Sequence, residues 1–181
     1  MTMNDLDTEI PVLGAVKIPS PILRGQAGEK NHGFVAEDQR ILVDLDAETV
    51  IQNIQSGRIP PSYELAGPRK EIYFDPSKLR CALVTCGGLC PGLNDIIRSV
   101  VLELHWGYGV RNIYGIRYGL RGFIAQFGHD VIDLTPEYVS NSHERGGTVL
   151  GSSRGPQEVE EIVDCLERMN IGVLFMIGGD G

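Results

Sequence analysis

The sequence predicts an α/β fold in which an open, parallel sheet of the Rossmann type carries helices on both faces. Short apolar runs at residues 79–85, 111–117, 131–134 and 172–179 have the length and composition of strands, and the first is interpreted as a strand buried on both faces. Two segments between them, residues 93–109 and 156–170, repeat apolar side chains at helical spacing. Strands that alternate with helices favour a parallel sheet with right-handed crossovers.

The ends of the first helix and of a second, shorter one are marked by local signals. Gly107 and Gly109 are expected to close the first helix, and Trp106 and Tyr108 are expected to pack against the core beside them. Thr135, followed by a proline, is predicted to cap a short helix.

Residues 1–76 differ from the rest of the chain, because proline and glycine recur there and apolar periodicity is weak. We interpret them as an irregular N-terminal extension, with residues 77–181 forming the α/β domain. Residues 48–56 are the exception, since they predict a short helix that ends at Gly57.

Charge and composition exclude several classes of function. Sixteen Lys and Arg against 24 Asp and Glu give a net charge of -8, which argues against a general nucleic-acid binder. The first 20 residues lack the basic and apolar regions of a secretory signal, and no apolar run reaches about 20 residues, so we expect a cytoplasmic protein without a membrane partner. The four cysteines lack paired spacing and are interpreted as reduced thiols, with a metal or redox site as the alternative.

The glycine-rich segment 86–92 follows the first predicted strand and precedes the first helix. Adjacent Gly87 and Gly88 let the backbone approach a ligand, and the helix that follows presents free amides and a positive dipole end. Both features suit a phosphate. The segment lacks the Lys-Ser/Thr of a P-loop and the G-x-G-x-x-G spacing of a dinucleotide site, and by itself it is also consistent with a simple tight turn.

A second glycine-rich segment follows the last predicted strand, and a third lies between them in the sequence. Asp180 between two glycines places a carboxylate at the sheet edge, where it either holds Mg²⁺ with phosphate oxygens or serves only as a turn residue. Residues 146–156 surround Arg154 with glycines and serines, a composition that can fold over an anion. The alternative for Arg154 is an ordinary solvated side chain.

The segments CGGLCPGLND, GIRYGLRGF, RGGTVLGSSRGPQ and IGGDG, in this order and at these separations, resemble the phosphofructokinase family. The similarity is greatest to its long-chain, ATP-dependent branch, known from plants, protists and some bacteria, and it runs from about residue 65 to Gly181. The chain looks like the N-terminal part of such an enzyme. The resemblance implies that the second domain and the catalytic base lie beyond Gly181, so no catalytic residue is expected within this chain, and the chain alone is expected to be inactive.

The family pattern implies roles for six residues of this sequence. Gly87 corresponds to the first-loop glycine at the donor phosphates, and Arg154 and Gly155 correspond to a pair that contacts the nucleotide. Gly179, Asp180 and Gly181 correspond to the loop after the last strand, where Asp180 would hold Mg²⁺. Gly181 points to ATP as the donor, since pyrophosphate users usually carry Asp there. Leu120 replaces an aromatic residue that lies near the adenine in bacterial members, although Tyr118 is close in sequence.

The resemblance therefore implies ATP-dependent phosphorylation of fructose 6-phosphate to fructose 1,6-bisphosphate, a step of glycolysis, with Mg²⁺ as cofactor and a homo-oligomer as the full-length form. Three alternatives stay open: a pyrophosphate-dependent enzyme acting on the same sugar, another kinase sharing a Gly-Gly-Asp-Gly strand end, and a non-catalytic nucleotide-binding fragment.

Overall fold

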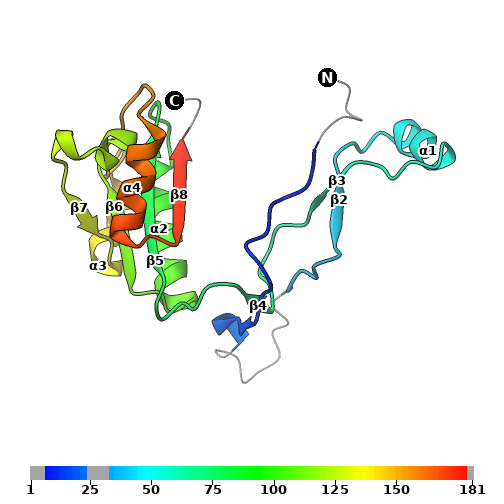
Figure 1. Ribbon diagram of the computed structural model, residues 1–181, viewed down its shortest axis with the longest axis horizontal. Helices are drawn as coiled ribbons and strands as arrows, with labels where there is room; N and C mark the ends of the chain where they lie inside the picture. The colour runs from blue at the N-terminus through cyan, green and yellow to red at the C-terminus, as the bar shows by residue number, and fades with distance from the viewer. Residues whose placement is uncertain (1–6, 24–32, 179–181) are drawn as a thin grey trace. The chain divides into compact units, whose positions relative to one another are not determined.

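The computed structural model describes residues 7–23 and 33–178, and the chain divides into two compact units at residues 73 and 74. The predicted boundary lay three residues later, at residues 76 and 77. Figure 1 shows one unit built of short strands and an α-helix, and the other built of a sheet with helices. Within the described ranges, no helix is both long enough and apolar enough to span a bilayer.

The first unit consists of two small antiparallel ladders. One pairs β1 (Ile18–Pro19) with β4 (Glu71–Ile72), and the other pairs β2 (Arg40–Leu42) with β3 (Ser62–Glu64). Helix α1 (Ala47–Gln55) connects β2 to β3, and η2 (Pro21–Leu23) is a 3₁₀ turn. The Asp46 side chain caps α1 by accepting from the Thr49 amide at 2.9 Å, and Gly57 takes a φ of 72° just beyond the helix. The predicted helix and its end at Gly57 are confirmed.

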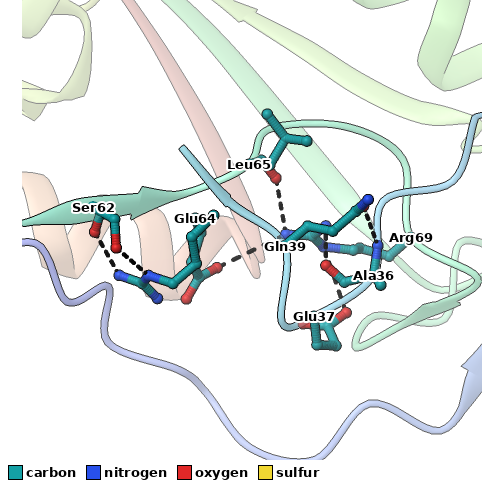
Figure 2. Close-up of polar contacts among 8 residues, drawn as sticks. Ala36, Glu37, Gln39, Ser62, Glu64, Leu65 and Arg69 are labelled. Carbon is teal, nitrogen blue, oxygen red and sulfur yellow. Dashed lines mark hydrogen bonds and ion pairs between the residues drawn. The ribbon is translucent and has the colours of Figure 1, made fainter. Parts of the chain in front are cut away.

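Polar contacts to the backbone hold this unit together (Figure 2). Across the β2–β3 pair, Arg40 donates to Ser62 through Nε to Oγ at 2.9 Å and through Nη2 to the carbonyl oxygen at 2.6 Å. Arg69 donates to the carbonyl oxygens of Ala36 and Leu65, at 3.3 and 3.0 Å. Among the described residues, every fully buried apolar side chain belongs to the second unit. The first unit is thus held by hydrogen bonds more than by a core.

The second unit contains the α/β domain. Its strands are β5 (Arg80–Cys86), β6 (Asn112–Ile116), β7 (Val131–Asp133) and β8 (Val173–Gly178). Its α-helices are α2 (Leu93–Leu102), α3 (Pro136–Val139) and α4 (Val159–Met169). Shorter turns are the π-turn η3 (Glu103–Gly107) and the 3₁₀ turns η4 (Gly119–Phe123), η5 (Ala125–Phe127) and η6 (Ser142–Glu144). The Thr135 side chain caps α3 as predicted, accepting from the Tyr138 amide at 3.2 Å.

The sheet has the order β7-β6-β5-β8. Strand β5 lies between β6 and β8 and runs parallel to both, with Cys86 opposite Gly178 at the carboxyl end. The edge strand β7 runs antiparallel to β6, which the prediction of a parallel sheet did not anticipate. The reason is the connection between them: it consists of 3₁₀ turns instead of a crossover helix, and Val131 begins β7 opposite Ile116, where β6 ends.

The core forms two layers because alternate side chains of β5 point to opposite faces of the sheet. Cys81 and Leu83 pack with Ile97 and Val101 of α2 on one face. On the other face, Ala82 and Val84 pack with Cys165 of α4. Helices therefore cover both faces, and the predicted α/β fold class is confirmed (Figure 1).

The end of α2 departs from the prediction at one aromatic residue. Tyr108 packs against the buried cluster as expected, but Trp106 is 67% exposed. The cause is the π-turn η3, in which the Tyr108 amide bonds to the Glu103 carbonyl, five residues back. The wider turn carries Trp106 off the buried face.

Candidate functional site: a pocket between two glycine-rich loops

The candidate site lies at the carboxyl ends of β5 and β8. The central strand β5 and its neighbour β8 end side by side, and β5 is followed by α2 on one face while β8 follows α4 on the other. A topological switch point of this kind is where open α/β sheets bind ligands. Gly178 permits the close approach, because a Cβ there would stand 2.1 Å from the Cys86 carbonyl oxygen.

Gly87 begins the first loop and links it to the loop that contains Arg154. Its φ of 77° lies in the left-handed region, which favours glycine. The Gly87 amide donates to the Ser153 carbonyl at 3.1 Å, and its own carbonyl accepts from the Ser152 hydroxyl at 2.7 Å. The amide of Gly87 is thus engaged within the protein, and the residue's place in the site comes from joining the two loops.

The N-terminus of α2 follows this loop. Gly92 occupies the N-cap position with a φ of 88°, and no side chain caps the helix there. The first-turn amides of an uncapped helix are available to a solvent molecule or an anion. Asp95 lies in the same turn and offsets part of the positive dipole end.

The second loop, residues 145–155, is held to this edge of the sheet by buried polar side chains. The Thr85 hydroxyl at the end of β5 donates to the Gly151 carbonyl at 2.7 Å. Asn94, which is 2% exposed in the first turn of α2, accepts from the Val149 amide through Oδ1 and donates to the Arg145 carbonyl through Nδ2, both at 2.8 Å. These contacts span 51 to 66 residues of sequence.

Between the two loops lies an open pocket of about 490 Å³, which we call the phosphate pocket. Its described lining consists of glycines and hydroxyl-bearing residues with one leucine and one arginine: Gly87, Gly88, Leu89, Gly146, Gly147, Thr148, Gly151, Ser152, Ser153 and Arg154. Arg154 is the charged member, and its Nη2 lies 3.6 Å from the point where a Cβ on Gly88 would stand. An open backbone, hydroxyl groups and a guanidinium together fit an anion such as a phosphate chain.

The described lining contains no carboxylate, and no group of three metal-ligating side chains occurs in residues 7–23 and 33–178. The described lining therefore offers hydroxyl groups and a guanidinium to an anion, and it offers no carboxylate to a cation. Burial raises the pKa of the Cys86 thiol at the start of the first loop, with a backbone hydrogen bond from Leu120 acting in the opposite direction. Cys86 is accordingly a protonated packing residue at neutral pH.

An aromatic side chain lies beside the pocket, at Tyr118. It has a φ of 59°, its amide donates to the Leu150 carbonyl at 2.9 Å, and its ring would lie 2.8 Å from a Cβ on Gly151. The ring also contacts His129, with centroids 4.6 Å apart. Leu120, by contrast, packs against the core layer beneath α4. The aromatic surface next to the pocket is therefore supplied by Tyr118.

The six predicted site residues fall into three groups. Gly87 and Arg154 line one pocket, although they are 67 positions apart in the sequence. Gly155 has a φ of 92°, is exposed, and lies next to the pocket without lining it. Gly179, Asp180 and Gly181 lie outside the described residues.

Sequence reasoning missed the three side chains that join the loops: Thr85, Asn94 and Ser152. Two of them could have been suspected from the sequence. Thr85 is a polar residue within an apolar strand, and Asn94 is a polar residue that follows Leu93 in the first turn of a predicted helix. Buried polar groups in such positions need partners, but the sequence does not say which ones.

The comparisons with known proteins all return phosphofructokinases. The phosphofructokinase family model matches residues 80–181. The chain is 45% identical over 180 residues to the ATP-dependent 6-phosphofructokinase of Borreliella burgdorferi, covering 98% of this chain and 39% of that protein. It is 42% identical over 186 aligned positions to the enzyme of the same name from Amycolatopsis methanolica, covering 100% of this chain and 39% of that protein.

Among solved structures, the phosphofructokinase of Saccharomyces cerevisiae aligns with a TM-score of 0.49 at 22% identity, covering 59% of this chain and 14% of that one. The chain spans 39% of the length of the two bacterial relatives. Since the family model matches more than half of the 181 residues, the chain belongs to the phosphofructokinase family.

Proposed function

We propose that this chain supplies the donor-binding part of an ATP-dependent 6-phosphofructokinase, which transfers a phosphoryl group from Mg-ATP to the 1-hydroxyl of fructose 6-phosphate. The observation that supports this most is the phosphate pocket, whose lining combines open glycine backbone, three hydroxyl-bearing residues and Arg154. The names of the relatives in Borreliella and Amycolatopsis point the same way. A glycolytic role, a cytoplasmic location and a homo-oligomeric full-length form are parts of the same proposal.

The residues of this chain would act by positioning and by offsetting charge, which is most of what a phosphoryl-transfer enzyme needs. Arg154 would pair with donor phosphate oxygens, and the amides at the N-terminus of α2 would add a partial positive charge. Asp180 is proposed as the Mg²⁺ carboxylate, and the ion would neutralise charge on the phosphates. Gly155, Gly179 and Gly181 would leave space for the nucleotide.

Tyr118 favours a nucleotide over pyrophosphate as the donor. Its ring, which also contacts Arg117 and His129, is 39% exposed and lies against Gly151 of the phosphate pocket, so a base could contact its exposed part while the phosphates occupy the pocket. Pyrophosphate has no base and would gain nothing from this surface. Gly181 supports the same preference through the family pattern.

The test compares the two donors on the full-length protein with fructose 6-phosphate and Mg²⁺. We expect ATP to support turnover with a kcat/KM at least about tenfold above that of pyrophosphate, a difference of about 1.4 kcal/mol. The variant Tyr118→Ala should lower kcat/KM for ATP and leave any activity with pyrophosphate unchanged. Greater activity with pyrophosphate would favour the pyrophosphate-dependent alternative, and nucleotide binding without turnover would favour a non-catalytic role.

A further inference from the structure

Thr85 occupies an unusual position for a polar side chain, fully buried near the end of the central strand β5. Its hydroxyl oxygen lies 2.7 Å from the Gly151 carbonyl oxygen and 2.9 Å from the Thr148 hydroxyl oxygen. Both partners belong to the wall of the phosphate pocket. A strand residue that does not line the pocket thus holds two residues that do.

The direction of each hydrogen bond follows from the number of protons. A carbonyl oxygen can only accept, so the Thr85 hydroxyl group uses its single proton in the hydrogen bond to the Gly151 carbonyl. The Thr148 hydroxyl must then donate to Thr85, and it accepts in turn from the Leu150 amide at 3.2 Å. The chain of bonds begins and ends in residues 148–151, and Thr85 is the member that comes from the sheet.

Asn94 holds the same wall from the other side. Its two hydrogen bonds reach the carbonyl of Arg145 and the amide of Val149, which enclose the pocket residues Gly146, Gly147 and Thr148. The enclosed glycines have no side chain with which to fix themselves: a Cβ on either would meet nothing within 4 Å. The position of this wall therefore depends on contacts made at its two ends.

We propose that Thr85 and Asn94 are positioning residues for the phosphoryl donor: together they form a clamp that fixes residues 145–151 against the sheet, so that the pocket is preformed before the donor binds. The proposal rests on the function proposed above. Neither side chain lines the pocket, so both act through the wall that they hold. Preorganised sites bind more tightly because less conformational freedom is lost on binding.

A merely structural role for Thr85 makes a different prediction. If the hydrogen bonds of Thr85 only compensate for the burial of its hydroxyl group, removing that group should lower stability without changing donor affinity in the folded protein. If it positions the wall, its loss should raise the KM and Kd for the donor even where the protein stays folded. Donor affinity and local exchange of the wall amides separate the two roles, whereas a melting temperature does not.

The matched pair of variants is Thr85→Val and Thr85→Ser in the full-length protein. Valine keeps the shape and removes both hydrogen bonds, while serine keeps the hydroxyl. We expect Thr85→Val to raise the Kd for Mg-ATP, measured by calorimetry, by about tenfold, and Thr85→Ser to stay within about threefold of the parent. The KM for fructose 6-phosphate should change little in either variant.

Hydrogen exchange measured without ligand gives a second readout that does not depend on the proposed function. In Thr85→Val the amides of Leu150 and Gly151, which bond to the Thr148 hydroxyl and carbonyl, should exchange about tenfold faster than in Thr85→Ser. Thr135→Val is the control, because it removes the hydroxyl that caps α3 but touches neither loop. It should leave donor affinity and the exchange of residues 148–151 unchanged.

Equal donor affinity in Thr85→Val and Thr85→Ser, or equal exchange of Leu150 and Gly151, would overturn the clamp. If Thr85→Val does not fold, Asn94→Ala tests the same idea by releasing residues 145 and 149, with the same two changes expected. A parent protein that binds neither Mg-ATP nor pyrophosphate would overturn the proposed function instead. The exchange result would still decide whether the wall is held by the clamp.

Discussion

Arg154 is the charged side chain among the described residues that line the phosphate pocket, so it should dominate the electrostatic part of donor binding. It is exposed at the pocket mouth, where water screens charge, and this limits its contribution. Its planar guanidinium can still pair with two phosphate oxygens at once, which an ammonium group cannot do. Geometry as well as charge should therefore matter at this position.

The prediction at Arg154 uses a graded pair of variants. Arg154→Ala should raise the KM for ATP by roughly 30-fold, which corresponds to about 2 kcal/mol for the loss of a charged hydrogen-bonding partner. Arg154→Lys keeps the charge and should lie between this variant and the parent. Arg168→Ala, at an exposed arginine on α4, is the control and should leave the KM unchanged. Steady-state kinetics at fixed ionic strength would decide, and an unchanged KM in Arg154→Ala would count against a donor role.

The sequence was most informative about site residues where a residue type has few structural roles other than contact with a ligand. Adjacent glycines after a strand, and an arginine among glycines and serines, led to Gly87 and Arg154, and the structure places both in one pocket. Thr85 and Asn94 were missed because their partners lie 51 to 66 residues away along the chain. Local patterns carry no information about such pairings.

The elements that build the site are β5 and β8, and their spacing depends on Gly178. A Cβ at this position would stand 2.1 Å from the carbonyl oxygen of Cys86 and 3.1 Å from its amide nitrogen, both backbone atoms that cannot move alone. A larger residue would push the ends of the two strands apart. The first glycine-rich loop, which follows β5, would shift with that strand.

Gly178→Ala should accordingly lower the free energy of unfolding by about 2 kcal/mol, because the added methyl group would press on the backbone of Cys86 and force the strand ends to shift. Gly146→Ala is the matched control, because a Cβ there would meet nothing within 4 Å. The two variants can be compared by urea denaturation followed by circular dichroism. If both unfold at the same urea concentration, strand β8 tolerates displacement and the spacing argument fails.

Sequence periodicity predicted the elements better than it predicted how they join. The strands of the sheet, α2 and α4 were expected from apolar runs and helical spacing, and the structure contains them. The antiparallel direction of β7 was not, because it follows from 3₁₀ turns in residues 119–127 that have no apolar period of their own. The prediction that Trp106 packs against the core was wrong for a similar reason. The π-turn directs this one side chain to solvent, while the helical spacing of the preceding apolar residues is unchanged.

The two units of the molecule differ in what stabilises them. Among the described residues, the buried apolar side chains are confined to the second unit, where they form a layer on each face of the sheet. The first unit relies on short ladders and on arginine contacts to backbone carbonyls (Figure 2). The weak apolar periodicity of residues 1–76 agrees with this division, because it leaves few apolar side chains to bury. The central strand β5 contributes side chains to both of these layers, so it should govern the stability of the α/β domain.

Strand β5 also makes that stability dependent on pH in the alkaline range. Burial raises the pKa of the Cys81 thiol from its ordinary value of 9.0 to about 11, and it raises the pKa of Cys86 as well. Between pH 9 and about 11 the native state therefore keeps protons that the unfolded chain releases. Because the native state binds more protons there, stability is at its full value below pH 9 and falls as the pH rises toward 11.

The variant Cys81→Ala removes the larger of these two titrations. It should be less stable than the parent at pH 8, because a buried side chain is truncated, but its stability should fall less steeply between pH 9 and pH 10.5. Cys90→Ala, at the exposed cysteine of the first loop, should keep the slope of the parent. Urea unfolding of the three proteins at several pH values, followed by circular dichroism, measures these slopes. If Cys81→Ala lost stability as steeply as the parent, alkaline unfolding would have its origin elsewhere, and the buried thiol of β5 would contribute packing alone.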